Sequence, residues 1–202
     1  MLDRALRPLK DRLLGPVARA LAPHTRPGVV TAAALCAGVA TAVLAWKGWY
    51  AAALAGWLVN RVLDGLDGTV ARARRAASDR GGYIDLLADF LVYALIPLGV
   101  AAGRPEENAH APVAWLLASF YVNAMSWMYI AAVLERRGMG PRQAGGQTSI
   151  AMPEGVIGGT ETLLFYGAIL LFPGEFRLLM LVMAALTVAG AAQRTIWVWR
   201  RL

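Results

Sequence analysis

Six apolar segments constrain the fold of this chain more than any other feature of its sequence. Each is close to the roughly 20 residues that a helix needs to cross a hydrocarbon core of about 30 Å. Their approximate ranges are 28–46, 48–66, 83–102, 111–134, 154–172 and 176–198. Because the connections between them are short, the sequence predicts an all-α integral membrane protein with six transmembrane helices in one antiparallel bundle and no soluble domain.

The first 22 residues have a different pattern, in which leucine and valine recur at helical spacing with arginine and lysine between them. Such a pattern is typical of an amphipathic helix that lies on a membrane surface with its basic face toward lipid phosphates. The alternative is a solvated basic tail. We therefore expect a juxtamembrane helix over residues 1–22 and a six-helix domain over residues 23–202.

Basic residues are distributed unequally between the two sets of loops, and loops rich in arginine and lysine are retained in the cytoplasm. One set contains the N-terminal cluster, the arginines of 72–80, those of 136–142 and the C-terminal pair, whereas the other has only Lys47, Arg104 and Arg177. This predicts six crossings of an inner or plasma membrane with both termini in the cytoplasm. The net charge of +7 suits nucleic acid or anionic lipid, but the apolar spans favour lipid, so no nucleic-acid partner is expected.

Five of the seven aspartates fall within residues 64–89, and four of these form two closely spaced pairs, at Asp64 and Asp67 and at Asp85 and Asp89. Spacings of three and four residues put the first two on one helix face and the last two on another. These two acidic stripes are joined by a short basic link, so they can face each other and hold cations. The charge topology places them at the cytoplasmic surface.

Several carboxylates at membrane depth require a compensating charge. A salt-bridged cluster with nearby arginines is one interpretation, but like charges three and four residues apart favour a divalent cation. All the candidate ligands are oxygen atoms, which predicts Mg²⁺ or Mn²⁺ rather than Zn²⁺ and leaves the choice between the first two open. Two such ions, beside glycines that let a ligand approach the backbone, suit chemistry on a diphosphate.

The spacing D-x2-D-G-x2-A-R-x8-G-x3-D-x3-D resembles the signature of the CDP-alcohol phosphatidyltransferase family. All eight fixed positions match, at Asp64, Asp67, Gly68, Ala71, Arg72, Gly81, Asp85 and Asp89. The resemblance implies transfer of a phosphatidyl group from a CDP-linked lipid, commonly CDP-diacylglycerol, to a small alcohol with release of CMP. It also implies a six-helix membrane protein with an N-terminal surface helix, usually a homodimer.

The resemblance further implies a role for each motif residue. The first three aspartates would be metal ligands, and Asp89 would be both a metal ligand and the general base that acts on the incoming hydroxyl. Gly68 and Ala71 would leave space for the cytidine, and Arg72 would help to bind the CDP group. These assignments predict the donor half of the reaction.

A second family feature is a Pro-Asn pair a few residues before a threonine, at the start of the first crossing. Here Gly28 replaces the asparagine, and Thr31 keeps the threonine position. Thr31 can face the diphosphate of the CDP-lipid, or it can serve only to start a helix.

The acceptor alcohol is left open by the sequence. A phosphorylated alcohol such as glycerol 3-phosphate or inositol phosphate requires fixed cations, and Arg142 and Arg194 are candidates. Glu154 and Glu161 can instead pair with Arg194, bind acceptor hydroxyls or attract the amino group of serine, and phosphatidylglycerol is a further acceptor to consider. The alternative function is a non-enzymatic metal-binding or cation-transport membrane protein.

Overall fold

The computed structural model describes residues 2–139 and 155–201, which form seven α-helices, one short 3₁₀ helix and no strand. The all-α prediction is therefore confirmed for the described residues. In chain order the elements are α1 (Leu2–Leu21), α2 (Pro27–Trp46), α3 (Tyr50–Ala73), α4 (Asp79–Ala102), η1 (Pro105–Glu107), α5 (His110–Arg136), α6 (Gly159–Leu171) and α7 (Phe176–Arg201).

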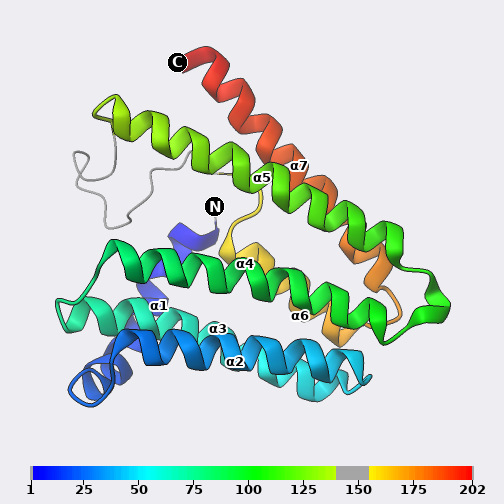
Figure 1. Cartoon of the computed structure of the whole chain (residues 1–202), viewed down its shortest axis with the longest axis horizontal. Coiled ribbons are helices and arrows are strands. Elements are labelled where there is room, and N and C mark those ends of the chain that lie inside the picture. The colour runs from blue at the N-terminus through cyan, green and yellow to red at the C-terminus, as the bar shows by residue number, and fades with distance from the viewer. Residues whose placement is uncertain (1, 140–154, 202) are drawn as a thin grey trace.

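The long helices run back and forth between two ends of the molecule (Figure 1). The connections at 47–49, 103–109 and 172–175 lie at one end, and those at 22–26 and 74–78 lie at the other. The C-terminal end of α3, the N-terminal end of α4 and the C-terminal half of α7 therefore share one end. This is the end that carries the arginine-rich connections.

Four helices, α2, α4, α5 and α7, are long and apolar enough to cross a membrane, so the chain is an integral membrane protein. The fifth predicted span, 154–172, differs from the structure because α6 has only 13 residues, a length of about 20 Å. Residues 155–158 precede it without helical structure, and Glu154 lies outside the described residues. Crossing by α3 and α6, and hence the count of six, stays a prediction.

Glycines let α2 approach α3 and α4 closely. A Cβ atom on Gly99 of α4 would overlap the carbonyl oxygen of Ala42 on α2, and one on Gly56 of α3 would lie 2.7 Å from Oγ1 of Thr41. Small residues at such crossings allow backbone-to-backbone packing, which drives helix association in a membrane. These three helices therefore form a tight unit that carries the acidic stretch.

The remaining helices pack on this unit in different ways. The C-terminal half of α1 buries Ala18 against α2 and α3, while Leu13 and Val17 point outward with exposed fractions of 64% and 46%. Helix α6 packs on α3, and α5 packs mainly on α7. Consequently α5 and α7 pair chiefly with each other and join the acidic unit through one apolar core, which includes Leu116, Met180 and Val92.

Candidate active site

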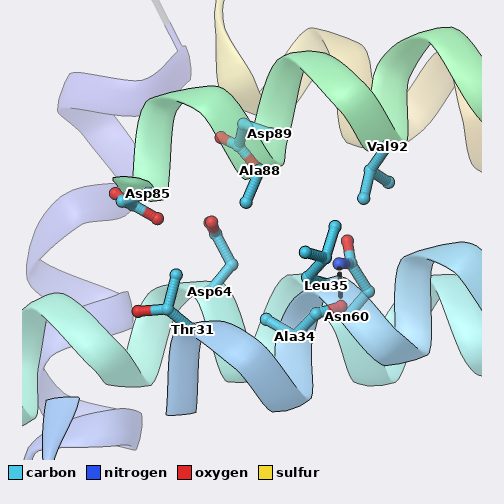
Figure 2. Close-up of a pocket in the computed structure, with 9 residues that line it drawn as sticks. All are labelled: Thr31, Ala34, Leu35, Asn60, Asp64, Asp85, Ala88, Asp89 and Val92. Atoms are coloured by element: carbon cyan, nitrogen blue, oxygen red, sulfur yellow. Dashed lines mark hydrogen bonds between the residues drawn. The ribbon is translucent and has the colours of Figure 1, made fainter. Parts of the chain in front are cut away.

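The two acidic stripes occupy the ends of α3 and α4 that are joined by the basic connection. Helix α3 continues beyond the predicted 48–66 span to Ala73, which puts Asp64 and Asp67 in its last turns. Helix α4 starts at Asp79, where Ser78 acts as the N-cap and accepts a hydrogen bond of 3.1 Å from the amide of Gly81. The helix then presents Gly81, Asp85 and Asp89 one turn apart. Figure 2 shows Asp64 pointing from α3 toward α4, where Asp85 and Asp89 lie.

A small cavity of about 10 Å³ lies between the helices, which is room for about one water-sized body. Three of the four predicted carboxylates line it, and Asn60 stabilises its wall by donating a hydrogen bond of 2.7 Å to the carbonyl of Ala34. The complete lining is Thr31, Ala34, Leu35, Asn60, Asp64, Asp85, Ala88, Asp89 and Val92. The structure thus brings α2, α3 and α4 together around the predicted site.

Asp67 is the most deeply placed member, with an exposed fraction of 5%. Oγ1 of Thr31 donates a hydrogen bond of 2.8 Å to its Oδ2, and its side chain also hydrogen-bonds to Asp85. The hydrogen bond to Asp67 brings Thr31 into the site, so this residue does more than begin α2.

Arg61 is a site residue that sequence reasoning missed. It bridges the two stripes, because one terminal nitrogen lies 3.5 Å from Oδ2 of Asp64 and the other 2.7 Å from Oδ1 of Asp89. The signal was present, since Arg61 and Asp64 are the two charged residues of the predicted 48–66 span, where charges are costly and usually functional.

The donor rim of the site is the part of α3 that follows Asp67 and carries Gly68, Ala71 and Arg72. A Cβ atom on Gly68 would make only an ordinary contact of 3.5 Å with the side chain of Arg72, so packing does not require glycine there. Ala71 is half-buried beside it, and Arg72 is exposed and donates a hydrogen bond of 3.2 Å to Oγ1 of Thr69. These partly or fully exposed positions are those at which the resemblance predicts the cytidine and CDP contacts.

The donor set fits a hard divalent cation. The side chains that line the cavity offer carboxylate, hydroxyl and amide oxygens, which Mg²⁺ and Mn²⁺ prefer. In residues 2–139 and 155–201, however, no three acidic, histidine or cysteine side chains already stand at the mutual spacing of a formed metal site. Binding therefore requires side-chain rotation, in which Asp64 would exchange its 3.5 Å contact with Arg61 for the ion.

The candidate acceptor residues differ in their burial and in their hydrogen-bond partners. Arg194 on α7 is 3% exposed, and its Nη1 donates hydrogen bonds of 2.7 Å to Oδ1 of Asn123 and 3.0 Å to Oγ of Ser126 on α5. Its Nε is buried and, like that of Arg104, has no hydrogen-bond partner among the described residues. Glu161 accepts a hydrogen bond of 3.0 Å from the amide of Gly158, which makes it a cap of α6. Arg142, like Glu154, lies outside the described residues.

Comparison with known families decides between the candidate functions. The profile of the CDP-alcohol phosphatidyltransferase family matches residues 24–197. The chain belongs to this family. It is therefore an enzyme of the CDP-alcohol phosphatidyltransferase class, which transfers a phosphatidyl group from a CDP-linked lipid to an alcohol. Membership removes the main reason to consider a cation transporter.

Individual relatives agree with the family assignment. The inner membrane protein YnjF of Escherichia coli K12 is 39% identical over 191 residues, which cover 92% of this chain and 89% of that protein. The fold is similar to that of phosphatidylinositol phosphate synthase PgsA1 of Mycobacterium tuberculosis. Its structure with CDP-DAG bound superposes with a TM-score of 0.71 at 24% identity and covers 93% of this chain and 94% of that one. Its structure with manganese and citrate gives 0.71 at 23% identity, with coverages of 92% and 88%.

Proposed function

We propose that this enzyme uses CDP-diacylglycerol as the donor and a phosphorylated small alcohol, such as glycerol 3-phosphate or inositol phosphate, as the acceptor, in a reaction that depends on Mg²⁺ or Mn²⁺. The observation that carries the donor half is the cavity at which carboxylates of α3 and α4 face each other. All eight positions of the family signature surround it or lie on the same two helix ends. The PgsA1 structures with CDP-DAG and with manganese support this choice of ligands.

The four aspartates divide the work of the reaction. Asp64, Asp67 and Asp85 hold two metal ions, with Thr31 orienting the carboxylate of Asp67 through its 2.8 Å hydrogen bond. When bound, such ions neutralise a diphosphate and stabilise CMP as a leaving group. Asp89 also contacts an ion and accepts the proton of the acceptor hydroxyl, which makes the alcohol oxygen a better nucleophile. Turnover thus requires the three carboxylates that line the small cavity together with Asp67, which is buried beside them.

The donor rim binds the donor head group. Gly68 and Ala71 leave a surface without bulky side chains on which the cytidine lies. Arg72 is exposed next to them and can turn from Thr69 to the diphosphate of CDP, since a guanidinium forms strong charge-assisted hydrogen bonds with phosphate oxygens. The acyl chains stay in the bilayer.

The acceptor phosphate is bound by Arg194. Asn123 and Ser126 hold its Nη1 in place, while its buried Nε has no acceptor among residues 2–139 and 155–201. A buried N–H without an acceptor is costly, and a phosphate oxygen would satisfy it. Arg194 lies in the C-terminal half of α7, at the same end of the molecule as the aspartates (Figure 1). Glu161 supports serine as acceptor less well, because its carboxylate caps a helix.

The membrane arrangement is part of the same proposal. Six helices, α2 to α7, cross the bilayer, with the acidic site and both termini at the cytoplasmic face, as the arginine distribution predicts. Residues 1–22 lie along the surface, with the exposed Leu13 and Val17 in lipid, and residues 23–202 form the catalytic domain. Two copies form a homodimer.

CMP release tests this function directly. Full-length protein is purified and mixed with CDP-diacylglycerol, Mg²⁺ or Mn²⁺, and one alcohol at a time from a panel of glycerol 3-phosphate, inositol phosphate, serine and phosphatidylglycerol. We expect CMP with one phosphorylated acceptor and none after chelation of the metal by EDTA. CMP with serine alone would contradict the acceptor assignment. No CMP with any acceptor and either metal would contradict the donor assignment as well, and cation flux into liposomes would then be measured.

A further inference from the structure

Arg61 uses every nitrogen of its guanidinium group inside the protein. Besides its ion pairs with Asp64 and Asp89, its Nη1 donates a hydrogen bond of 2.9 Å to the hydroxyl of Tyr93, and its Nε donates one of 2.7 Å to Oδ1 of Asn60. The side chain is only 12% exposed. The nitrogen atoms of the Arg61 guanidinium are therefore held in place by partners from both α3 and α4.

Aromatic rings also hold the flat faces of this guanidinium. Its Cζ lies 4.6 Å from the ring centroid of Trp57 and 5.2 Å from that of Tyr93, within the range of cation–π attraction. Trp57 is fully buried, and its Nε1 donates a hydrogen bond of 3.1 Å to the carbonyl of Leu163 on α6. The hydroxyl of Tyr166, also on α6, donates one of 2.5 Å to the carbonyl of Tyr93. The position of Arg61 is thus linked to α6.

The contact with Asp89 orients the carboxylate proposed as the base. Oδ1 of Asp89 is held at 2.7 Å by Arg61, whereas Oδ2 receives only a long hydrogen bond of 3.4 Å from the Tyr93 hydroxyl. One oxygen is therefore firmly anchored, and the other is available for the proton of the acceptor. A base acts efficiently only when it is held at the correct distance and angle, and a misplacement of about 1 Å costs about 100-fold in rate.

We propose that Arg61 is a positioning residue of the phosphatidyl transfer, which anchors Oδ1 of Asp89 and ties it through Trp57 and Tyr93 to α6. This inference rests on the proposed function, because it requires Asp89 to act as the base. It predicts that Arg61 governs turnover and contributes little to donor or metal binding. A purely structural ion pair would instead affect folding, metal binding and turnover together.

The test compares kcat, the KM for CDP-diacylglycerol and Mn²⁺ binding, measured by electron paramagnetic resonance, in full-length Arg61→Gln and Arg61→Lys. We expect kcat to fall about 100-fold in both, because an ammonium group cannot reproduce the forked contact. The KM for the donor should stay within about threefold of the wild-type value, since the donor rim does not involve Arg61. Mn²⁺ binding should be unchanged or tighter, because a neighbouring positive charge has been removed in Arg61→Gln.

Arg104→Gln is the matched control. Arg104 is another embedded arginine, which pairs with Glu107, donates a hydrogen bond of 3.0 Å to the carbonyl of Pro173 and stacks on Phe176, but it lies at the opposite end of the bundle. Its loss should lower the melting temperature and leave kcat unchanged. A milder variant, Tyr93→Phe, removes only the hydroxyl that contacts Arg61 and Asp89, and we expect it to lower kcat about threefold to tenfold.

Three results would overturn the inference while the proposed function stands: an active wild type with unchanged kcat in Arg61→Gln, full rescue by lysine, or loss of Mn²⁺ binding in parallel with kcat. If both Arg61 variants fail to fold, unchanged kcat in Tyr93→Phe overturns it. A wild type that releases no CMP with any acceptor overturns the proposed function, and the inference with it.

Discussion

The unit of α2, α3 and α4 differs from the pair of α5 and α7 in how completely its buried arginine is hydrogen-bonded. In the three-helix unit, Thr31 contacts Asp67, and Arg61 satisfies Asp64 and Asp89. In the helix pair, Arg194 keeps a buried Nε without a partner in the described part of the chain. The arginine of the first region is fully used by protein partners, whereas that of the second has a donor that a ligand can use. This difference supports the proposal that donor chemistry and acceptor choice are located in different parts of the bundle.

The largest effect is expected at Asp89. Asp89→Asn removes the base and should lower kcat about 1,000-fold while CDP-diacylglycerol binding is kept. Asp64→Asn should instead weaken Mn²⁺ binding itself, as measured by electron paramagnetic resonance. Asp79→Asn, on the same helix but outside the motif, is the control. Equal turnover in the wild type and Asp89→Asn would contradict the assignment of Asp89 as the general base.

The next largest effect is expected at Arg194, on the acceptor side of the comparison. Arg194→Gln should raise the KM for the phosphorylated acceptor by about 10-fold to 100-fold, since it removes a charge-assisted hydrogen bond, and should leave the KM for the donor unchanged. CMP release at varied acceptor and donor concentrations measures both. The exposed Arg200 on the same helix supplies the control variant Arg200→Gln. A rise in the donor KM alone would show that the two regions do not divide the substrates as proposed.

The smallest effect concerns the close packing of the three-helix unit. In Gly99→Ala, the new Cβ atom overlaps the backbone of α2 at Ala42, which should destabilise the protein by about 1–3 kcal/mol. Thermal unfolding of the detergent-solubilised protein checks this. Gly28→Ala on α2 has no atom within 4 Å of the new Cβ and should not lower the melting temperature. Equal melting temperatures for the two variants would mean that α2 and α4 adjust freely.

The helices and the acidic stripes were predictable because both depend on local spacing. Runs of about 20 apolar residues require helices in lipid, and gaps of three and four residues define one face of a helix. Helix ends were less predictable: α3 extends past residue 66 because its last turns lie among protein side chains and at the loop end, where apolar character is not required. The shortness of α6 was also missed, since residues 155–158 are apolar enough to read as a span but pack without helical structure beside Arg194.

By itself, the sequence determined the helical class, the membrane environment and the family, and it predicted the four carboxylates of the donor site. Only the tertiary structure decided which residues meet those carboxylates. The partnership of Arg61 with Asp89 spans 28 residues and that of Arg194 with Asn123 spans 71. Helix periodicity fixes which side chains share a face, but the residue opposite that face depends on how whole helices pack. The physical reason is that spacing is a local property of one helix, whereas partnership is a property of two.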